Sequence, residues 1–130
     1  MTPDEARAAV VSGEDAAVYA YSIAGARVPA ARRAAAGLDA HRAARDSVAA
    51  AMQSPPAPSP AYALPTEPTS PDQARALMAY VDNALVPLYA DLAAVSAEDE
   101  RRRAVLAAQA CATRAVSWGA ASQAFPSGVA

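Results

Sequence analysis

The amino-acid sequence predicts an all-α protein of four helices, and three observations lead to this prediction. Alanine supplies most of the 54% hydrophobic content, and it has the highest helix propensity of all residues. Apolar residues recur three or four positions apart in four long segments. Two of these segments begin with a capping residue followed by proline, a common helix start. We expect one domain over residues 1–118 and a loosely ordered tail over residues 119–130.

The first predicted helix starts at Thr2 and ends near Ala26. Thr2 can cap the helix, Pro3 suits its first turn, and Glu5 occupies the capping-box position three residues after the cap. The inward stripe is predicted to contain Ala6, Val10, Gly13, Ala17, Ala20 and Ala24, with Glu14 beside it.

The second predicted helix begins near Pro29, and its stripe is not purely apolar. His41, the only histidine of the chain, and Arg45 stand at positions where a packed helix favours apolar side chains. The whole stripe is Ala31, Ala34, Leu38, His41, Arg45, Val48 and Met52.

The last two predicted helices start at Ser70 and at Ser96. In the third, Gln73 takes the capping-box position. The fourth extends to about Trp118, and alanine on nearly every side leaves its inner face poorly marked. The stripe of the third helix reads Ala74, Met78, Val81, Leu85, Leu88, Leu92 and Val95.

The connection over residues 54–70 contains six prolines, which exclude a helix or a central strand. Helices of about 24 residues are about 36 Å long, and the 17 residues of this connection reach about 50 Å in polyproline geometry. The connection can therefore return along the whole molecule, so that the second and third helices run in the same direction. One long crossover between the middle helices is the connectivity of a ferritin-like four-helix bundle.

Composition and charge disfavour several classes of protein. The net charge of −2 and the pI near 5.3 argue against a nucleic-acid partner, which would require a basic face. The single cysteine, Cys111, lies in an alanine-rich segment and is expected to be a buried, inert thiol. The first residues lack the pattern of a signal peptide, and no apolar run is long enough to cross a bilayer. We therefore expect no membrane partner and a cytoplasmic location.

Three stretches of the chain resemble a known family: GEDAAVYAYSIAGAR, LDAHRAARDSV and PAYALP. They are similar to a ferritin-like domain family of unknown function that is common in actinobacterial proteins, and the similarity extends from about Val11 to Trp118. The resemblance implies a ferritin-like four-helix bundle and no particular activity.

The wider ferritin-like class often binds two iron ions, through a Glu from each of two helices and a Glu-x-x-His motif from each of the others. Glu14 and His41 match this pattern, but Leu38 stands where the second helix needs a Glu. In the third helix, Asp82 and Asp91 fall beside the stripe. The fourth helix has only Gln109 as an inward polar group. Two ligands of six are too few, so we expect no metal and no cofactor.

Glu14, His41 and Arg45 are predicted to meet between neighbouring helices, because burying an unpaired charge costs several kcal/mol. Asp46 or one of the tyrosines Tyr19, Tyr21 and Tyr89 could complete this candidate buried polar network. Two alternatives remain at this point. The second helix could be rotated so that these side chains reach solvent, or the cluster could bind a ligand.

Three functions are compatible with these features. The protein could act without catalysis, by association as a homodimer, through exposed apolar residues and a tail that contains Trp118 and Phe125. It could bind a small ligand or a single metal ion at Glu14 and His41. It could be an enzyme with His41 as general base, but no nucleophile, cleft or phosphate loop is evident, so no catalytic residue is assigned. The first is our prediction.

Overall fold

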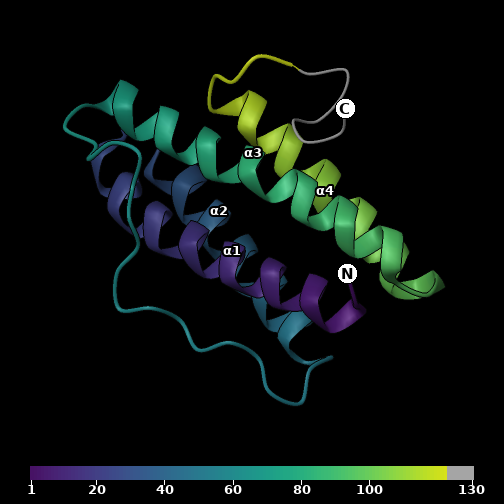
Figure 1. The fold of residues 1–130 in the computed structure, drawn as a ribbon. Helices are drawn as coiled ribbons and strands as arrows, with labels where there is room; N and C mark the ends of the chain where they lie inside the picture. The colour runs from purple at the N-terminus through teal and green to yellow at the C-terminus, as the bar shows by residue number, and fades with distance from the viewer. Residues whose placement is uncertain (123–130) are drawn as a thin grey trace.

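The structure is a computed structural model that describes residues 1–122. Figure 1 shows four helices, α1 (Pro3–Ala24), α2 (Ala31–Ala49), α3 (Pro71–Val95) and α4 (Glu98–Ser117), and a short 3-10 turn at Gly25–Arg27. No strand occurs within the described residues. The predicted all-α class with four helices is confirmed. Most of the predicted tail, from residue 123 onwards, lies outside the described residues.

The helix starts follow the predicted caps in two cases of three. Thr2 accepts a hydrogen bond from the Glu5 amide at 3.1 Å, and the Glu5 carboxylate accepts one from the Thr2 amide at 2.8 Å. Ser70 caps α3. The predicted cap at Ser96 is wrong, because its hydroxyl donates to the Leu92 carbonyl at 2.6 Å and so closes α3 instead of opening α4.

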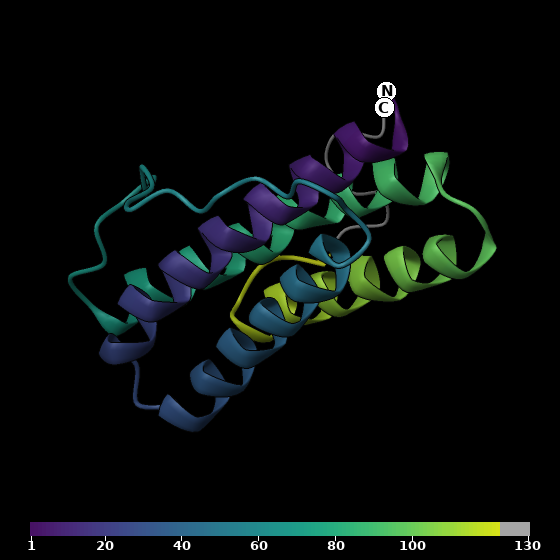
Figure 2. The same ribbon diagram turned by 90° about the horizontal axis from the view of Figure 1, so that it is seen from below.

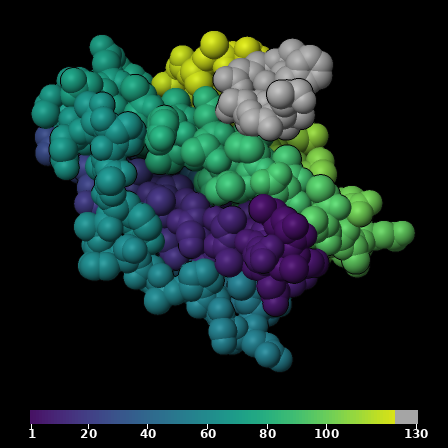
Figure 3. Space-filling model, viewed as in Figure 1, coloured from purple at the N-terminus to yellow at the C-terminus, as the bar shows by residue number. Residues whose placement is uncertain are grey.

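Helix α1 packs against both α2 and α3, and α3 packs against α4. Figures 1 and 2 show that α2 and α3 run in the same direction, opposite to α1 and α4. Residues 50–70 form no helix or strand, and they pass back along the molecule from the end of α2 to the start of α3. Figure 3 shows this linker against the surface of α1. Its anchors are Pro68, which is fully buried, and Tyr62, whose ring lies 5.7 Å from that of Tyr19.

Alanine is the commonest residue of the core, and a few large side chains fill the rest of it. Those that are almost fully buried include Tyr21, Tyr89, Met78, Leu85 and Leu92. Trp118 is also buried, so the prediction that it forms part of an exposed contact surface is wrong. Phe125, the other aromatic residue of that prediction, lies outside the described residues. Within residues 1–122, no helix is long and apolar enough to cross a membrane.

Candidate functional site

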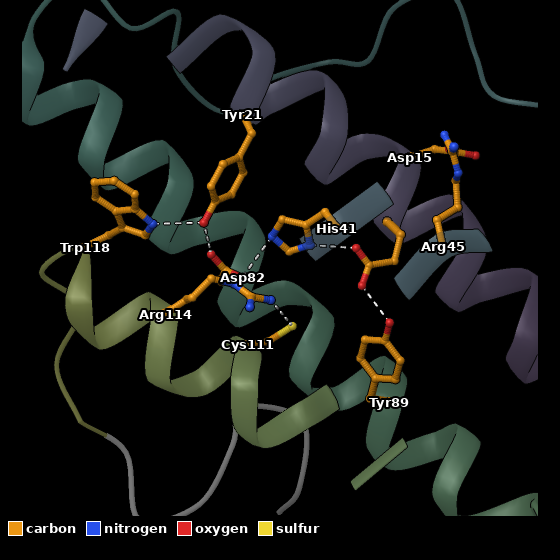
Figure 4. Close-up of polar contacts among 10 residues, drawn as sticks. Asp15, Tyr21, His41, Arg45, Asp82, Tyr89, Cys111, Arg114 and Trp118 are labelled. Atoms are coloured by element: carbon orange, nitrogen blue, oxygen red, sulfur yellow. Dashed lines mark hydrogen bonds and ion pairs between the residues drawn. The ribbon is translucent and has the colours of Figure 1, made fainter. Parts of the chain in front are cut away.

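Each of the four helices contributes one charged side chain to the centre of the molecule (Figure 4). Glu14 from α1, His41 from α2 and Asp82 from α3 have no exposed surface. The side chain of Arg114, from α4, is 25% exposed. We call these four residues the central cluster. Because an unpaired buried charge is unfavourable, the stability of the fold depends on how these groups pair.

His41 lies between the two carboxylates. Its Nδ1 is 2.6 Å from Glu14 Oε2, and its Nε2 is 3.1 Å from Asp82 Oδ1. The second contact has the distance of an ion pair but not the alignment of a hydrogen bond. Burial by itself lowers the pKa of His41, but the two carboxylates outweigh burial, and the pKa of His41 is raised on balance. The two carboxylates thus favour the protonated, cationic form of His41.

Two tyrosines donate hydrogen bonds to the two carboxylates in a reciprocal pattern. Tyr89 of α3 donates to Glu14 Oε1 at 2.6 Å, and Tyr21 of α1 donates to Asp82 Oδ2. In both helices the tyrosine follows the carboxylate by seven residues, which is about two helical turns. Because α1 and α3 are antiparallel, each carboxylate meets the tyrosine of the other helix. Burial raises the pKa of both phenols, so each keeps its proton and donates it to a carboxylate.

Residues near the end of α4 complete the pairing around Asp82. Arg114 Nε donates to Asp82 Oδ1 at 3.1 Å, and Trp118 Nε1 donates to the Tyr21 hydroxyl at 2.9 Å. Arg114 Nη2 also lies 3.6 Å from Cys111 Sγ. Burial raises the pKa of the Cys111 thiol, which is therefore protonated and a poor nucleophile. The central cluster thus pairs two acidic side chains, Glu14 and Asp82, with two basic ones, His41 and Arg114.

Of the predicted network, the structure brings together Glu14, His41 and one of the three tyrosines offered to complete it, Tyr89. The predicted contact between Glu14 and Arg45 is not formed. Arg45 lies one turn beyond His41, and its guanidinium is at 3.1 Å from Asp15 and 3.0 Å from Asp46. The side chain of Asp46 is mostly exposed. Arg45 thus pairs with the buried Asp15 and the exposed Asp46, apart from the central cluster.

Sequence reasoning missed Asp82 and Arg114. Asp82 was expected beside the stripe of the third helix, and this is wrong because it is fully buried. Gln109, expected to face inwards from α4, is exposed. The available signal in α3 was a stripe that overlaps the predicted one but has Asp82 in place of Val81 and Tyr89 in place of Leu88. Its members are Ala74, Met78, Asp82, Leu85, Tyr89 and Leu92.

The groups of the central cluster that could bind a metal ion are engaged by other side chains. Both His41 nitrogens face carboxylates, which favour the protonated imidazole, the form without a free lone pair. The Arg114 guanidinium occupies one side of Asp82. Among residues 1–122, no three or more His, Cys, Asp or Glu side chains are arranged to hold a metal ion.

A small cavity of about 70 Å³ lies between α2 and α4. Tyr89 and Leu92 of α3 line it, together with Ser47 of α2 and Arg103 of α4. It adjoins the central cluster, because the Tyr89 hydroxyl is bound to Glu14. Since a water molecule takes about 30 Å³ in the liquid, the cavity has room for only a very small molecule.

Comparison with known proteins places the chain in a family. Residues 6–130 match the family described as "Domain of unknown function (DUF4439)". The chain belongs to this family. One solved structure with a similar fold is the crystal structure of a conserved hypothetical protein, rv2844, from Mycobacterium tuberculosis. It has a TM-score of 0.85 and 24% sequence identity, over 89% of this chain and 93% of that one. Among curated proteins, none matches this sequence.

Proposed function

We propose that this protein is a ferritin-like four-helix bundle that acts without catalysis, by association with a second copy of itself. The parallel direction of α2 and α3 and the linker that returns along the molecule support the ferritin-like connectivity. The pairing within the central cluster supports a structural role for the buried charges. A general base must reach a proton of the substrate, whereas His41 has no exposed surface and contacts a carboxylate at each nitrogen.

The outward face of α4 is the observation that supports association. Residues 104–113 contain no charged side chain, and Leu106 at their centre is 56% exposed. Val105 and Val116 are exposed as well. A second copy offers the same uncharged surface, so a symmetric pairing leaves no charge without a partner. An interface of standard size buries roughly 800 Å² per subunit, so the neighbouring edge of α3 has to contribute too.

A hollow of about 300 Å³ continues this face onto α3. It is lined by Asn83 and Val86 of α3 and by Ala112, Thr113 and Val116 of α4, beside residues 121 and 122. Small side chains along α4 allow two helices to approach closely. The hollow and the protruding Leu106 are thus two complementary features within one surface, as a symmetric homodimer requires.

Sedimentation equilibrium over a range of protein concentrations tests association. We expect the mass to rise with concentration from the 13.2 kDa of a single chain to twice that value. Leu106→Asp should abolish the rise. Tyr80→Asp is the matched control, because Tyr80 is 55% exposed but borders the linker instead of α4. A single-chain mass at every concentration would reject the proposal.

A second candidate is a small-ligand or single-metal site at Glu14 and His41, and the cavity beside Tyr89 is the observation that favours it. Elemental analysis of protein purified without chelators tests the metal. A stoichiometric metal that disappears in the His41→Gln variant would support this candidate, and metal contents near zero would reject the single-metal form of it.

A further inference from the structure

The central cluster alternates in charge around the four helices. Glu14 of α1 and Asp82 of α3 are acidic, whereas His41 of α2 and Arg114 of α4 are basic. Helical bundles that hold metal ions instead direct carboxylates and neutral imidazoles from all four helices to one place, and the ions neutralise them. Here the neutralising charge is part of the chain.

We propose that Arg114 and His41 are resident cations that occupy the carboxylates of the bundle and so keep divalent metal ions out of its centre. Arg114 is the deciding residue. Its guanidinium donates to Asp82 at 3.1 Å and lies 3.6 Å from the Cys111 sulfur, so it stands between two groups that would otherwise be potential metal ligands.

The partial exposure of Arg114 makes it the member of the cluster that can be exchanged. Glu14, His41 and Asp82 have no contact with solvent, and a change in any of them disturbs the packing around it. Arg114 reaches the cluster from the edge of α4, with 25% of its side chain exposed. A shorter side chain at residue 114 therefore leaves room that opens towards water, through which an ion can enter.

A carboxylate at residue 114 converts the cluster into a set of metal ligands. Arg114→Glu places three carboxylates around His41, and the excess negative charge has no partner within the cluster. A divalent cation supplies that charge and takes the neutral form of His41 as a further ligand, with release of its proton. This inference is independent of association, because Arg114 points inwards from the edge of α4, whereas Leu106 lies on its exposed face.

Cobalt(II) is the probe, because its visible absorption reports bound ligands, and thermal unfolding is the second readout. We expect the wild-type protein to show neither a ligand-field spectrum nor a rise in Tm with Co²⁺. Arg114→Glu should have a low Tm without metal and should gain both signals at one ion per chain. Arg114→Gln has a side chain of the same shape as the glutamate variant but without its charge, and it should bind Co²⁺ at least tenfold more weakly. Arg102→Glu adds a carboxylate on the exposed side of α4 and should behave as the wild type.

Arg114→His covers the case in which the glutamate variant does not fold, because imidazole adds a ligand with a smaller change of charge. We expect a Co²⁺ spectrum and a higher Tm with this variant as well. Binding of Co²⁺ by the wild type at the cluster would overturn the proposal. Absence of binding by a folded Arg114→Glu or Arg114→His protein would overturn it too, whatever the oligomeric state.

Discussion

Gly37 of α2 lies directly against the ring of Tyr21, so closely that a Cβ atom at residue 37 would come within 2.5 Å of Tyr21 Cε2. The ring cannot easily move away, because its hydroxyl is bound to Asp82 and Trp118. The absence of a side chain at Gly37 thus allows α1 and α2 to approach closely around the central cluster.

Gly37→Ala should therefore destabilise the protein. Overpacking costs about 1–3 kcal/mol, and the better helix propensity of alanine returns at most about 1 kcal/mol. We expect a lower midpoint in urea unfolding. In a Tyr21→Leu background the ring is gone, and the same substitution should be neutral or stabilising. A stabilising effect of Gly37→Ala in the wild-type background would show that the contact does not limit packing.

Glu14→Gln keeps the shape of the side chain but removes the charge beside His41. Removing one partner of a buried ion pair costs about 3–5 kcal/mol, and the free energy of unfolding should fall by that amount. Asp91→Asn is the control, since it also replaces a carboxylate by an amide, but at an exposed position of α3. Its effect should stay within about 0.5 kcal/mol. Equal urea midpoints for the two variants would contradict the role of the buried pair.

The stability of the protein should fall as pH rises above 6.5. The pKa of His41 is raised in the folded state by Glu14 and Asp82 against the opposing effect of burial, from an ordinary value of 6.5. The stabilisation is complete below 6.5 and is lost as pH rises through the higher pKa of the folded protein. Urea midpoints measured from pH 6.5 upwards should decline in the wild type. His41→Gln, which lacks the only imidazole, should lose this decline.

Arg33 joins α2 to the end of α4, where the two helices otherwise make little direct contact. Its guanidinium lies 3.7 Å above the Trp118 ring and donates to the Ser117 carbonyl at 2.7 Å. Arg33→Ala should cost about 0.5–1 kcal/mol, the value of an exposed cation–π contact. Trp118 fluorescence in urea reports the loss. Arg32→Ala, one residue away and exposed, should leave both the emission and the midpoint unchanged.

Much of the fold could be predicted from local chemistry. The caps at Thr2 and Ser70 involve residues only three positions apart, so their pattern is visible in the sequence. The density of prolines in residues 54–70 likewise excludes helix without reference to any other part of the chain. The cap at Ser96 was predicted wrongly because a serine between two helices can cap the second helix or, as here, donate a hydrogen bond to a carbonyl of the first.

The central cluster was predicted only where its members stood out. His41 and Glu14 were recognised because a charge on an apolar face requires a partner. Asp82 was missed because α3 has two overlapping stripes that share Ala74, Met78, Leu85 and Leu92, and the one with Val81 and Leu88 is the more apolar. Arg114 was missed because alanine surrounds α4 and the arginine side chain reaches the cluster from the flank. Such choices depend on which helices become neighbours, and this is not encoded in any single segment.

The linker over residues 50–70 divides the molecule into two antiparallel helical hairpins, and each hairpin contains one anion and one cation of the central cluster. Glu14 and His41 belong to the first hairpin, Asp82 and Arg114 to the second. Each half can therefore neutralise its own interior before the two halves dock. A protein cut within this segment would consist of two fragments that are electrically balanced on their inner faces, and their reassembly would be driven by the burial of tyrosine and alanine surfaces and not by attraction between opposite charges.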